Sequence, residues 1–221
     1  MRLVLVGPPG CGKGTQAELL VKRLGLTQVG TGEILRDEMR RGTDLGKKIR
    51  PLMDQGLLVP DRDVDDVVAE LFRGASRPDK FVVDGYPRTY SQAIAFDALL
   101  LLQYLNLDAV ISLEIEDDEV VRRIGGRRQC SNTTCGTLFN VNSPAKTPKK
   151  AGICDKCNSP LMIRVDDKEE TIRRRLGEFH KNTDQLIEHY RKRNLLRSVS
   201  ATDAPETIYA NIVKALGRSP V

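Results

Sequence analysis

The sequence predicts an α/β fold in which a mainly parallel β-sheet is flanked by helices. Short apolar runs alternate with segments of helical periodicity, and this alternation is typical of parallel strands joined by crossover helices. A glycine-rich turn follows the first apolar run directly, as is common where a buried strand leads into a helix. The predicted strands are residues 3–6, 81–83, 109–115 and 195–199.

The helices are predicted from apolar spacing and from their first residues. In 14–24 and 64–72 the apolar residues recur at intervals of three and four, which places them on one helical face. Such faces are expected to pack on the sheet and not to bind ligands. Residues 167–170 and 203–206 each resemble a capping box, so we expect helices to begin near Asp167 and Asp203.

The turn at residues 7–15 reads Gly-Pro-Pro-Gly-Cys-Gly-Lys-Gly-Thr. Its glycines let backbone N–H groups face one concavity, Lys13 adds a charge, and the following helix presents its positive end. We therefore predict a P-loop NTPase-like sheet with a cradle for nucleotide phosphates. Gly14 stands where the common loop has Ser or Thr, so the usual metal-binding hydroxyl is displaced to Thr15.

Two segments fall outside the alternation and are interpreted as insertions. Residues 30–59 are rich in charge and of helical character, whereas residues 128–163 are loop-like, with Pro, Gly, Asn and four cysteines. At 221 residues the chain fits one nucleotide-binding domain that carries such insertions. The sequence contains no repeat of fixed period and no low-complexity tract.

The four cysteines of the second insertion have the spacing of a metal site. Cys130 and Cys135 are separated by four residues, Cys154 and Cys157 by two, and eighteen lie between the pairs. Two such pairs can bind one tetrahedral zinc ion, and four thiolates leave no open position, so the predicted role is structural. Two disulfides, an iron site or unrelated buried thiols remain as alternatives. Cys11 lies apart from the pairs and is interpreted as a small filler residue.

Composition is that of a soluble globular protein. Hydrophobic residues make up 40% and charged residues 29%, and no apolar stretch reaches the ~20 residues that a membrane span needs. No signal or transit peptide is evident, so we expect a cytoplasmic protein without a membrane partner. The net charge of +5 is compatible with nucleic-acid binding, but an enzyme that grips polyphosphates also needs many arginines.

Arginines are concentrated where phosphate groups would need them. Arg123 and Arg127 are four residues apart in an apparent helix, which would place them on one face. Any single arginine is as easily a solvated surface charge, but the whole set is not. The set comprises Arg36, Arg88, Arg122, Arg123, Arg127, Arg128, Arg164, Arg173, Arg174 and Arg175.

The remaining chemistry favours phosphoryl transfer. Asp84 ends a predicted strand, where P-loop enzymes place a carboxylate toward Mg²⁺. His180 and His189 lie in a predicted helix far from any motif, and no nucleophile and base are paired. A phosphate acceptor needs no base because its attacking oxygen is already anionic, so positioning and charge neutralisation would supply most of the rate.

Taken together, these motifs resemble the adenylate kinase family of the long-lid, metal-binding kind. They run in family order over nearly the whole chain, and the Asp-Gly-Tyr-Pro-Arg block is especially specific. The matching segments are 7–15, 31–36, 56–59, 84–88 with Gln92, 126–128, 164–167 and 170–175.

The resemblance implies that Mg·ATP and AMP are interconverted with two ADP. It implies a core of residues 1–29, 60–125 and 164–221, an AMP-binding flap at 30–59 and a lid with the four cysteines at 126–163. Asp166 and Asp167 would tie the lid to the core. The implied ATP site comprises Gly10, Cys11, Gly12, Lys13, Gly14, Thr15, Arg123, Arg127, Leu138, Phe139 and Val199. The implied AMP site comprises Thr31, Arg36, Leu57, Val59, Gly85, Arg88, Gln92, Arg164 and Arg175. The implied catalytic residues are Lys13, Asp84, Arg88, Arg127, Arg164 and Arg175.

The chain departs from the family pattern at three places. The first cysteine pair carries two extra residues, Glu33 replaces the Asp of many relatives, and Ser200 replaces a common Asp near the expected adenine contact. A kinase for GMP, UMP or CMP is the alternative of the same fold, although Thr31 and Gln92 favour AMP.

An alternative from another class is a nucleic-acid-binding protein with a zinc ribbon and a basic surface at Lys146, Lys149 and Lys150. It leaves the motifs around Arg36, Asp84 and Asp166 unexplained, and aromatics at 5% give few platforms for base stacking. We therefore expect no nucleic-acid partner. A monomer is expected because two moving flaps leave little surface for an interface.

Overall fold

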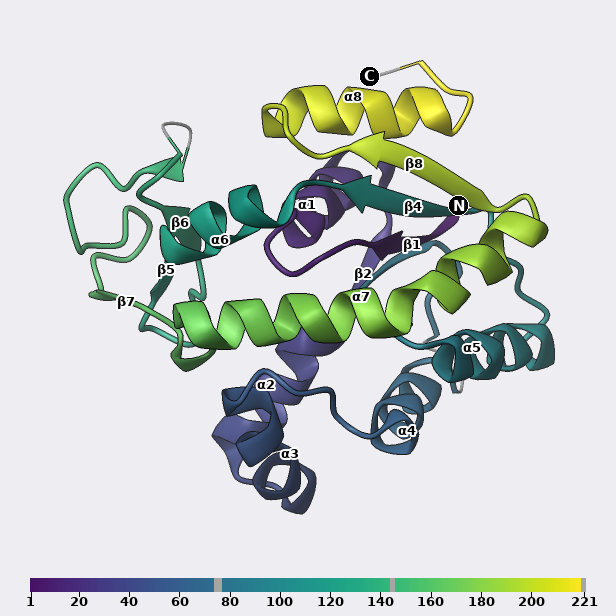
Figure 1. Ribbon diagram of the computed structural model, residues 1–221, viewed down its shortest axis with the longest axis horizontal. Helices are drawn as coiled ribbons and strands as arrows, with labels where there is room; N and C mark the ends of the chain where they lie inside the picture. The colour runs from purple at the N-terminus through teal and green to yellow at the C-terminus, as the bar shows by residue number, and fades with distance from the viewer. Residues whose placement is uncertain (74–76, 144–145, 220–221) are drawn as a thin grey trace.

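The computed structural model describes residues 1–73, 77–143 and 146–219. Its centre is a five-stranded parallel sheet with the strand order β2-β3-β1-β4-β8 (Figure 1). The α/β fold class predicted from the sequence is confirmed. The strands are β1 (Arg2–Val6), β2 (Thr27–Gly30), β3 (Phe81–Asp84), β4 (Ala109–Glu114) and β8 (Leu196–Ser200).

Helices cover both faces of this sheet because alternate strand residues point to opposite sides. Leu3 and Leu5 join a buried cluster with α1 (Lys13–Leu24) and α8 (Pro205–Ala215). Val4 and Val6 join a second cluster on the other face. That cluster is completed by α4 (Asp61–Leu71), α5 (Tyr90–Leu102) and α7 (Glu169–Lys192).

The second cluster contains a group of aromatic rings. Phe72 meets Phe81 and Phe96 edge to face, with centroids 5.1 and 5.6 Å apart. Pairs of this geometry contribute about 0.5–1.5 kcal/mol beyond the area they bury. They fix β3 against α5, and this contact sets the position of the loop between them, which carries site residues.

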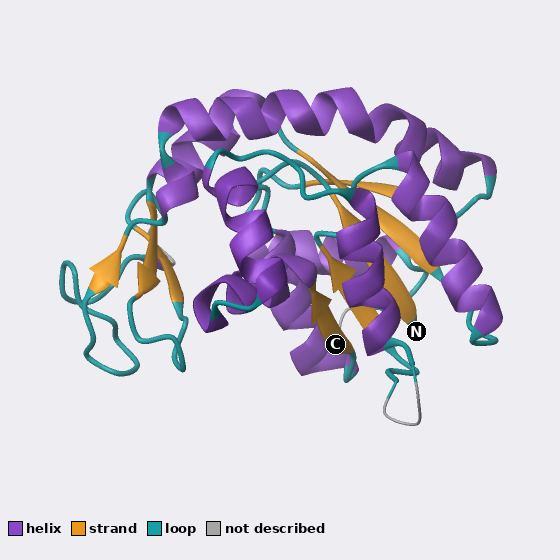
Figure 2. Ribbon diagram, turned by 90° about the horizontal axis from the view of Figure 1, so that it is seen from below, coloured by secondary structure: helices purple, strands orange, loops and turns teal. Residues whose placement is uncertain are grey.

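Two smaller parts project from the core, one below the long helix α7 and one beside one of its ends (Figure 1). The first is a pair of helices, α2 (Thr31–Arg41) and α3 (Asp44–Asp54). The two helices pack closely at Gly46, where an added Cβ would lie 2.1 Å from the Glu38 carbonyl oxygen. The second is a three-stranded antiparallel sheet that stands apart from the central sheet (Figure 2). Its strands are β5 (Arg127–Cys130), β6 (Leu138–Asn140) and β7 (Leu161–Met162).

This small sheet follows α6 (Asp117–Gly125) and precedes a 3₁₀ turn at Val165–Asp167. Its strands were not predicted, because none of them contains more than two consecutive apolar residues and the segment has the composition of a loop. None of the helices in the described part of the chain combines the length and apolar character needed to cross a membrane.

Several local predictions were wrong. Strand β2 was missed because it lies at the sheet edge and buries only Val29. Arg127 lies in β5 and not in a helix with Arg123, since α6 ends at Gly125. Neither predicted capping box forms: α7 begins at Glu169 and α8 at Pro205, each without a side-chain cap. Asp167 cannot cap α7 because its carboxylate binds Arg127 instead.

Candidate active site

The glycine-rich loop joins β1 to α1 and wraps around the start of the helix. Gly10 has a φ of +79°, and a Cβ there would lie 2.5 Å from Ile124 Cγ1, so the position requires glycine. Lys13 is the first residue of α1, and its Nζ donates to the Gly7 and Pro8 carbonyl oxygens at 2.7 and 2.8 Å. Cys11 is fully buried beneath the loop, as expected for a filler residue. Backbone N–H groups, the helix end and the ammonium together form a site for phosphate.

Asp84 lies beside this loop because β3 is the neighbour of β1 and pairs Leu5 with Asp84. A Cβ added to Gly14 would approach Asp84 Oδ2 to 3.5 Å. Burial raises the pKa of Asp84, and the charges of Lys13 and Arg88 oppose this rise. A half-buried carboxylate at a phosphate loop is the hard oxygen donor that a magnesium ion prefers, so Asp84 fits Mg²⁺.

A pocket next to Asp84 brings together most of the residues predicted to bind AMP. Gly85 has a φ of +86°, and a Cβ there would lie 2.9 Å from Thr31 Oγ1, so this close approach also requires glycine. The pocket is lined by Thr31, Leu35, Met53, Leu57, Leu58, Val59, Val64, Gly85, Arg88 and Gln92.

Arg88 is fixed at one end of this pocket. Its Nε donates to the Gly85 carbonyl at 2.7 Å, and its backbone N–H donates to Gln92 Oε1 at 2.7 Å. Desolvation by the surrounding protein and the positive charges of Arg175 and Arg36 lower the pKa of Arg88. Because the Arg88 side chain is exposed to the open cleft, water weakens this lowering.

A larger hollow of about 470 Å³ lies elsewhere, between α2, α3 and α4. Its lining is acidic and therefore unsuited to phosphate.

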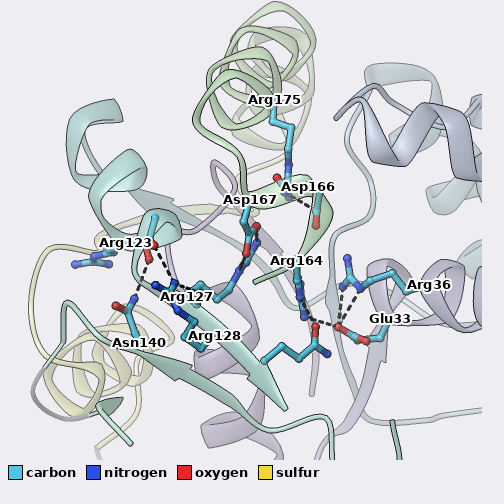
Figure 3. Close-up of polar contacts among 12 residues, drawn as sticks. Glu33, Arg36, Arg123, Arg127, Arg128, Asn140, Arg164, Asp166, Asp167 and Arg175 are labelled. Atoms are coloured by element: carbon cyan, nitrogen blue, oxygen red, sulfur yellow. Dashed lines mark hydrogen bonds and ion pairs between the residues drawn. The ribbon is translucent and has the colours of Figure 1, made fainter. Parts of the chain in front are cut away.

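Glu33 connects the helix pair to the base of the small sheet. Its Oε1 accepts from Arg36 Nη2 at 2.7 Å and from Arg164 Nη2 at 3.1 Å, and Figure 3 shows both arginines converging on it. Gln129 Oε1 accepts from Arg164 Nε at 2.6 Å. Burial and the neighbouring Arg36 and Arg127 lower the pKa of Arg164 to about 10. This guanidinium is therefore held among like charges, where a phosphate would be stabilised.

Two further arginines that were predicted to be catalytic, Arg127 and Arg175, pair with the aspartates that were predicted to tie the lid to the core. Arg127 forms a two-point ion pair with Asp167, whose side chain is completely buried, with Nε–Oδ2 at 2.7 Å. Arg175 Nη1 donates to Asp166 Oδ2 at 2.7 Å (Figure 3). These pairs join β5 and α7 through the 3₁₀ turn, so they link the small sheet to the core.

The residues predicted near the ATP base are only partly brought together. Arg123 donates to Glu119 Oε1 at 2.7 Å and to the Ala201 carbonyl oxygen at 2.8 Å, which places it at the loop after β8. Val199 is buried in the core of the sheet. Leu138 is exposed, whereas Phe139 packs on the cysteine cluster.

The four cysteines predicted to bind metal form a single cluster. Their sulfur atoms all lie within 4.8 Å of one another, with Cys130–Cys157 at 3.3 Å and Cys135–Cys154 at 3.7 Å. Four sulfurs around zinc at about 2.3 Å would be separated by about 3.8 Å, so the donor set fits zinc. The two extra residues of the first pair do not prevent this arrangement.

The sequence model of the family described as adenylate kinase matches residues 5–195. The chain belongs to the adenylate kinase family. It is 42% identical over 218 residues to an adenylate kinase of Streptomyces avermitilis, covering 99% of this chain and 98% of the relative. It is 41% identical over 217 residues to that of Caldicellulosiruptor saccharolyticus (98% and 99% covered) and 42% identical over 213 residues to that of Archaeoglobus fulgidus (96% of both). As a member of this family, the chain is a nucleoside monophosphate kinase, and hence a phosphotransferase.

Several neighbours of the adenylate kinase site were not predicted. Asp61 accepts from Gln92 Nε2 at 2.8 Å, Gln129 accepts from Arg164, and Lys146 Nζ donates to Thr15 Oγ1 at 2.6 Å. Each joins two elements that are distant in the sequence. Of these residues, only Lys146 was singled out in the sequence, as one of three lysines of a possible basic surface.

Replacement of Cys154 by Ser is expected to abolish zinc binding at the cluster and to lower the melting temperature of the zinc-loaded protein by about 5–10 °C. Cys154 is fully buried at the centre of the cluster, and its loss leaves three thiolates. Zinc content per chain and a thermal unfolding scan would measure both effects. Cys11→Ser is the matched control, since it alters a thiol outside the cluster and should keep a full complement of metal. An unchanged metal content in Cys154→Ser would contradict a four-cysteine site.

Proposed function

We propose that the chain transfers the terminal phosphoryl group of Mg·ATP to AMP and forms two ADP. The observation that carries this proposal is that the phosphate loop and the Arg88 pocket lie side by side. The phosphate loop follows β1, the pocket around Arg88 follows β3, and these strands are adjacent and parallel. Ligands of such sheets bind beyond the carboxyl ends of the strands, so two phosphate chains would meet there.

The transfer needs positioning and charge and no general base. The acceptor oxygen of AMP is anionic, and both histidines are engaged elsewhere, His189 with Asp97 and His180 with Asp117. In this proposal Lys13 binds the transferring phosphoryl group, and Arg88 and Arg36 hold the phosphate of AMP. Mg²⁺, which enters with ATP, neutralises phosphate charge, and Asp84 would hold it. Zinc in the cysteine cluster would be structural.

The proposed division of labour follows the three parts of the fold. Residues 30–59 form the AMP flap, residues 126–163 the lid, and residues 1–29, 60–125 and 164–221 the core. Arg127, Arg164 and Arg175 would close on the phosphoryl group. Asp167 would position Arg127, and Asp166 would position Arg175. Closure excludes water, which would otherwise accept the phosphoryl group.

The preference for AMP is supported by the fixed orientation of Gln92. Its Nε2 faces Asp61, which only accepts, and its Oε1 faces the backbone N–H of Arg88, which only donates. The amide therefore cannot flip, and it keeps one N–H and one lone pair for a base. Along its base-pairing edge, adenine presents a hydrogen-bond donor next to an acceptor, and guanine presents the two in the reverse order. An amide of fixed orientation therefore matches adenine or guanine, but not both.

The test is to mix the protein with ATP, Mg²⁺ and each of AMP, GMP, CMP and UMP in turn, and to follow ADP by chromatography. Two ADP formed per AMP, with little transfer to the other acceptors, is the expected result. Transfer to a different acceptor would replace AMP in the proposal, and absence of transfer to all four would refute it.

Asp61→Asn is expected to weaken discrimination between AMP and GMP by about 10-fold in kcat/KM, because an asparagine can face either end of the Gln92 amide. Asp66→Asn, an exposed change on the same helix, serves as the control. Kinetics with both acceptors would measure the ratio. If the ratio is the same in both variants, the fixed amide is not the source of the preference.

We also propose that the protein acts as a monomer in the cytoplasm. The described cysteines are free thiols, four of them arranged as metal ligands, and a reducing compartment keeps thiols in this state. Light scattering of the purified protein gives the oligomeric state directly.

A further inference from the structure

A lysine of the lid reaches the phosphate loop. Lys146 Nζ donates to Thr15 Oγ1 at 2.6 Å, although the two residues are 131 positions apart. Thr15 lies in the first turn of α1, two residues after Lys13. The contact therefore brings a second ammonium group, carried by a different part of the fold, to the edge of the cradle.

The chain that precedes this lysine is attached to the end of α6. Asn140 Nδ2 donates to the Arg123 carbonyl oxygen at 2.9 Å, and Asn142 Nδ2 donates to the Arg122 carbonyl oxygen at 2.8 Å. The backbone N–H of Lys146 then donates to the Ser143 carbonyl at 2.9 Å. The two asparagines satisfy carbonyls that a helix end leaves without partners. Because α6 packs on the phosphate loop through Ile124, the lysine is fixed relative to the cradle.

The ammonium group of Lys146 lacks an anionic partner. Its side chain is half-buried, and across residues 1–73, 77–143 and 146–219 no carboxylate lies within 4.0 Å of Nζ. The hydroxyl of Thr15 engages one of three N–H donors. Burial lowers the pKa of Lys146, opposed by the charge of Glu18. A partly desolvated cation with only a neutral partner is unfavourable, and a phosphate oxygen would stabilise it.

We propose that Lys146 is a phosphate-binding residue of the ATP site, delivered by the lid and positioned by Thr15. It binds the phosphate chain together with Lys13 when the lid lies over the loop. The Thr15 hydroxyl then serves this lysine and not the metal, because one oxygen cannot hold an ammonium and a divalent cation without strong repulsion. The inference rests on the proposed function only in that ATP occupies the loop.

The test measures binding directly, without turnover. Calorimetric titration with ATP, and with inorganic tripolyphosphate as a probe of the phosphates alone, is carried out on the full chain and on Lys146→Met and Lys149→Met. Lys149 is an exposed lysine of the same segment and is the matched control. We expect Lys146→Met to raise both dissociation constants about 10-fold and the control to change them less than 2-fold. Lys146→Arg is expected to recover most of the ATP affinity.

Two results would overturn the inference. In the first, Lys146→Met binds ATP and tripolyphosphate as tightly as Lys149→Met. In the second, Lys146→Met weakens AMP binding as much as ATP binding, which would indicate a general change in the lid. Zinc content and melting temperature establish that the variant is folded. The acceptor assay is independent: failure to phosphorylate AMP would refute the proposed function, while the binding comparison would still decide the role of Lys146.

Discussion

Lys13→Met is expected to lower kcat about 1,000-fold while the protein remains folded. The ammonium of Lys13 is held over the loop by the Gly7 and Pro8 carbonyl oxygens, so its position is set before any nucleotide binds. A preorganised charge stabilises the phosphoryl group most when negative charge is redistributed during transfer. Methionine keeps the length of the side chain and removes only the charge. Steady-state kinetics with saturating ATP and AMP would measure the loss.

Lys22→Met is the control for this change. Lys22 lies in the last turn of the same helix, is exposed, and should tolerate methionine with near-normal turnover. Lys22→Met should show the melting temperature of the parent protein within about 2 °C, because exposed charges contribute little to stability. Lys13→Met should unfold in one transition with a melting temperature lowered by about 5 °C, because it loses the two hydrogen bonds to the loop carbonyls. If Lys13→Met keeps more than about a tenth of the parent kcat, the proposed role of Lys13 is wrong.

The parts of the site that the sequence predicted are encoded locally. The phosphate loop and Asp84 each follow an apolar run directly, and strand ends of a parallel sheet meet at one edge. The cysteine cluster is equally local, because two short spacings bring each pair of thiols together. In these cases sequence neighbours are also spatial neighbours, so a pattern in the sequence is sufficient.

The parts that could not be predicted depend on contacts between distant elements. Glu33 contacts Arg164 and Lys146 contacts Thr15, each across 131 residues, and no spacing rule relates their positions. Asp167 has the local pattern of a helix cap, but a buried ion pair with Arg127 takes its carboxylate. The edge strand β2 gave no signal because burial, which produces apolar runs, is small at the edge of a sheet.

Arg88→Lys is expected to lower kcat/KM for AMP about 100- to 1,000-fold, although the positive charge is kept. Arg88 is oriented by two bonds, from its Nε to the Gly85 carbonyl and from its backbone N–H to Gln92. The first bond leaves the two Nη groups of the guanidinium fork free to grip one phosphate at two points. Lysine carries a point charge on a flexible stem and cannot reproduce that geometry.

The selectivity of the loss would distinguish this role from a general effect of charge. Arg88→Lys should leave the dissociation constant of ATP within about 2-fold, because the phosphate loop is a separate site, while AMP binding weakens. Arg191→Lys alters an exposed arginine whose ion pair, within the described part of the chain, is with Glu188, and it should change neither. Equal loss of ATP and AMP binding in Arg88→Lys would mean that Arg88 supports the shared cleft and not the acceptor. A loss confined to AMP would place the acceptor phosphate at the end of β3, within reach of the donor held at the end of β1.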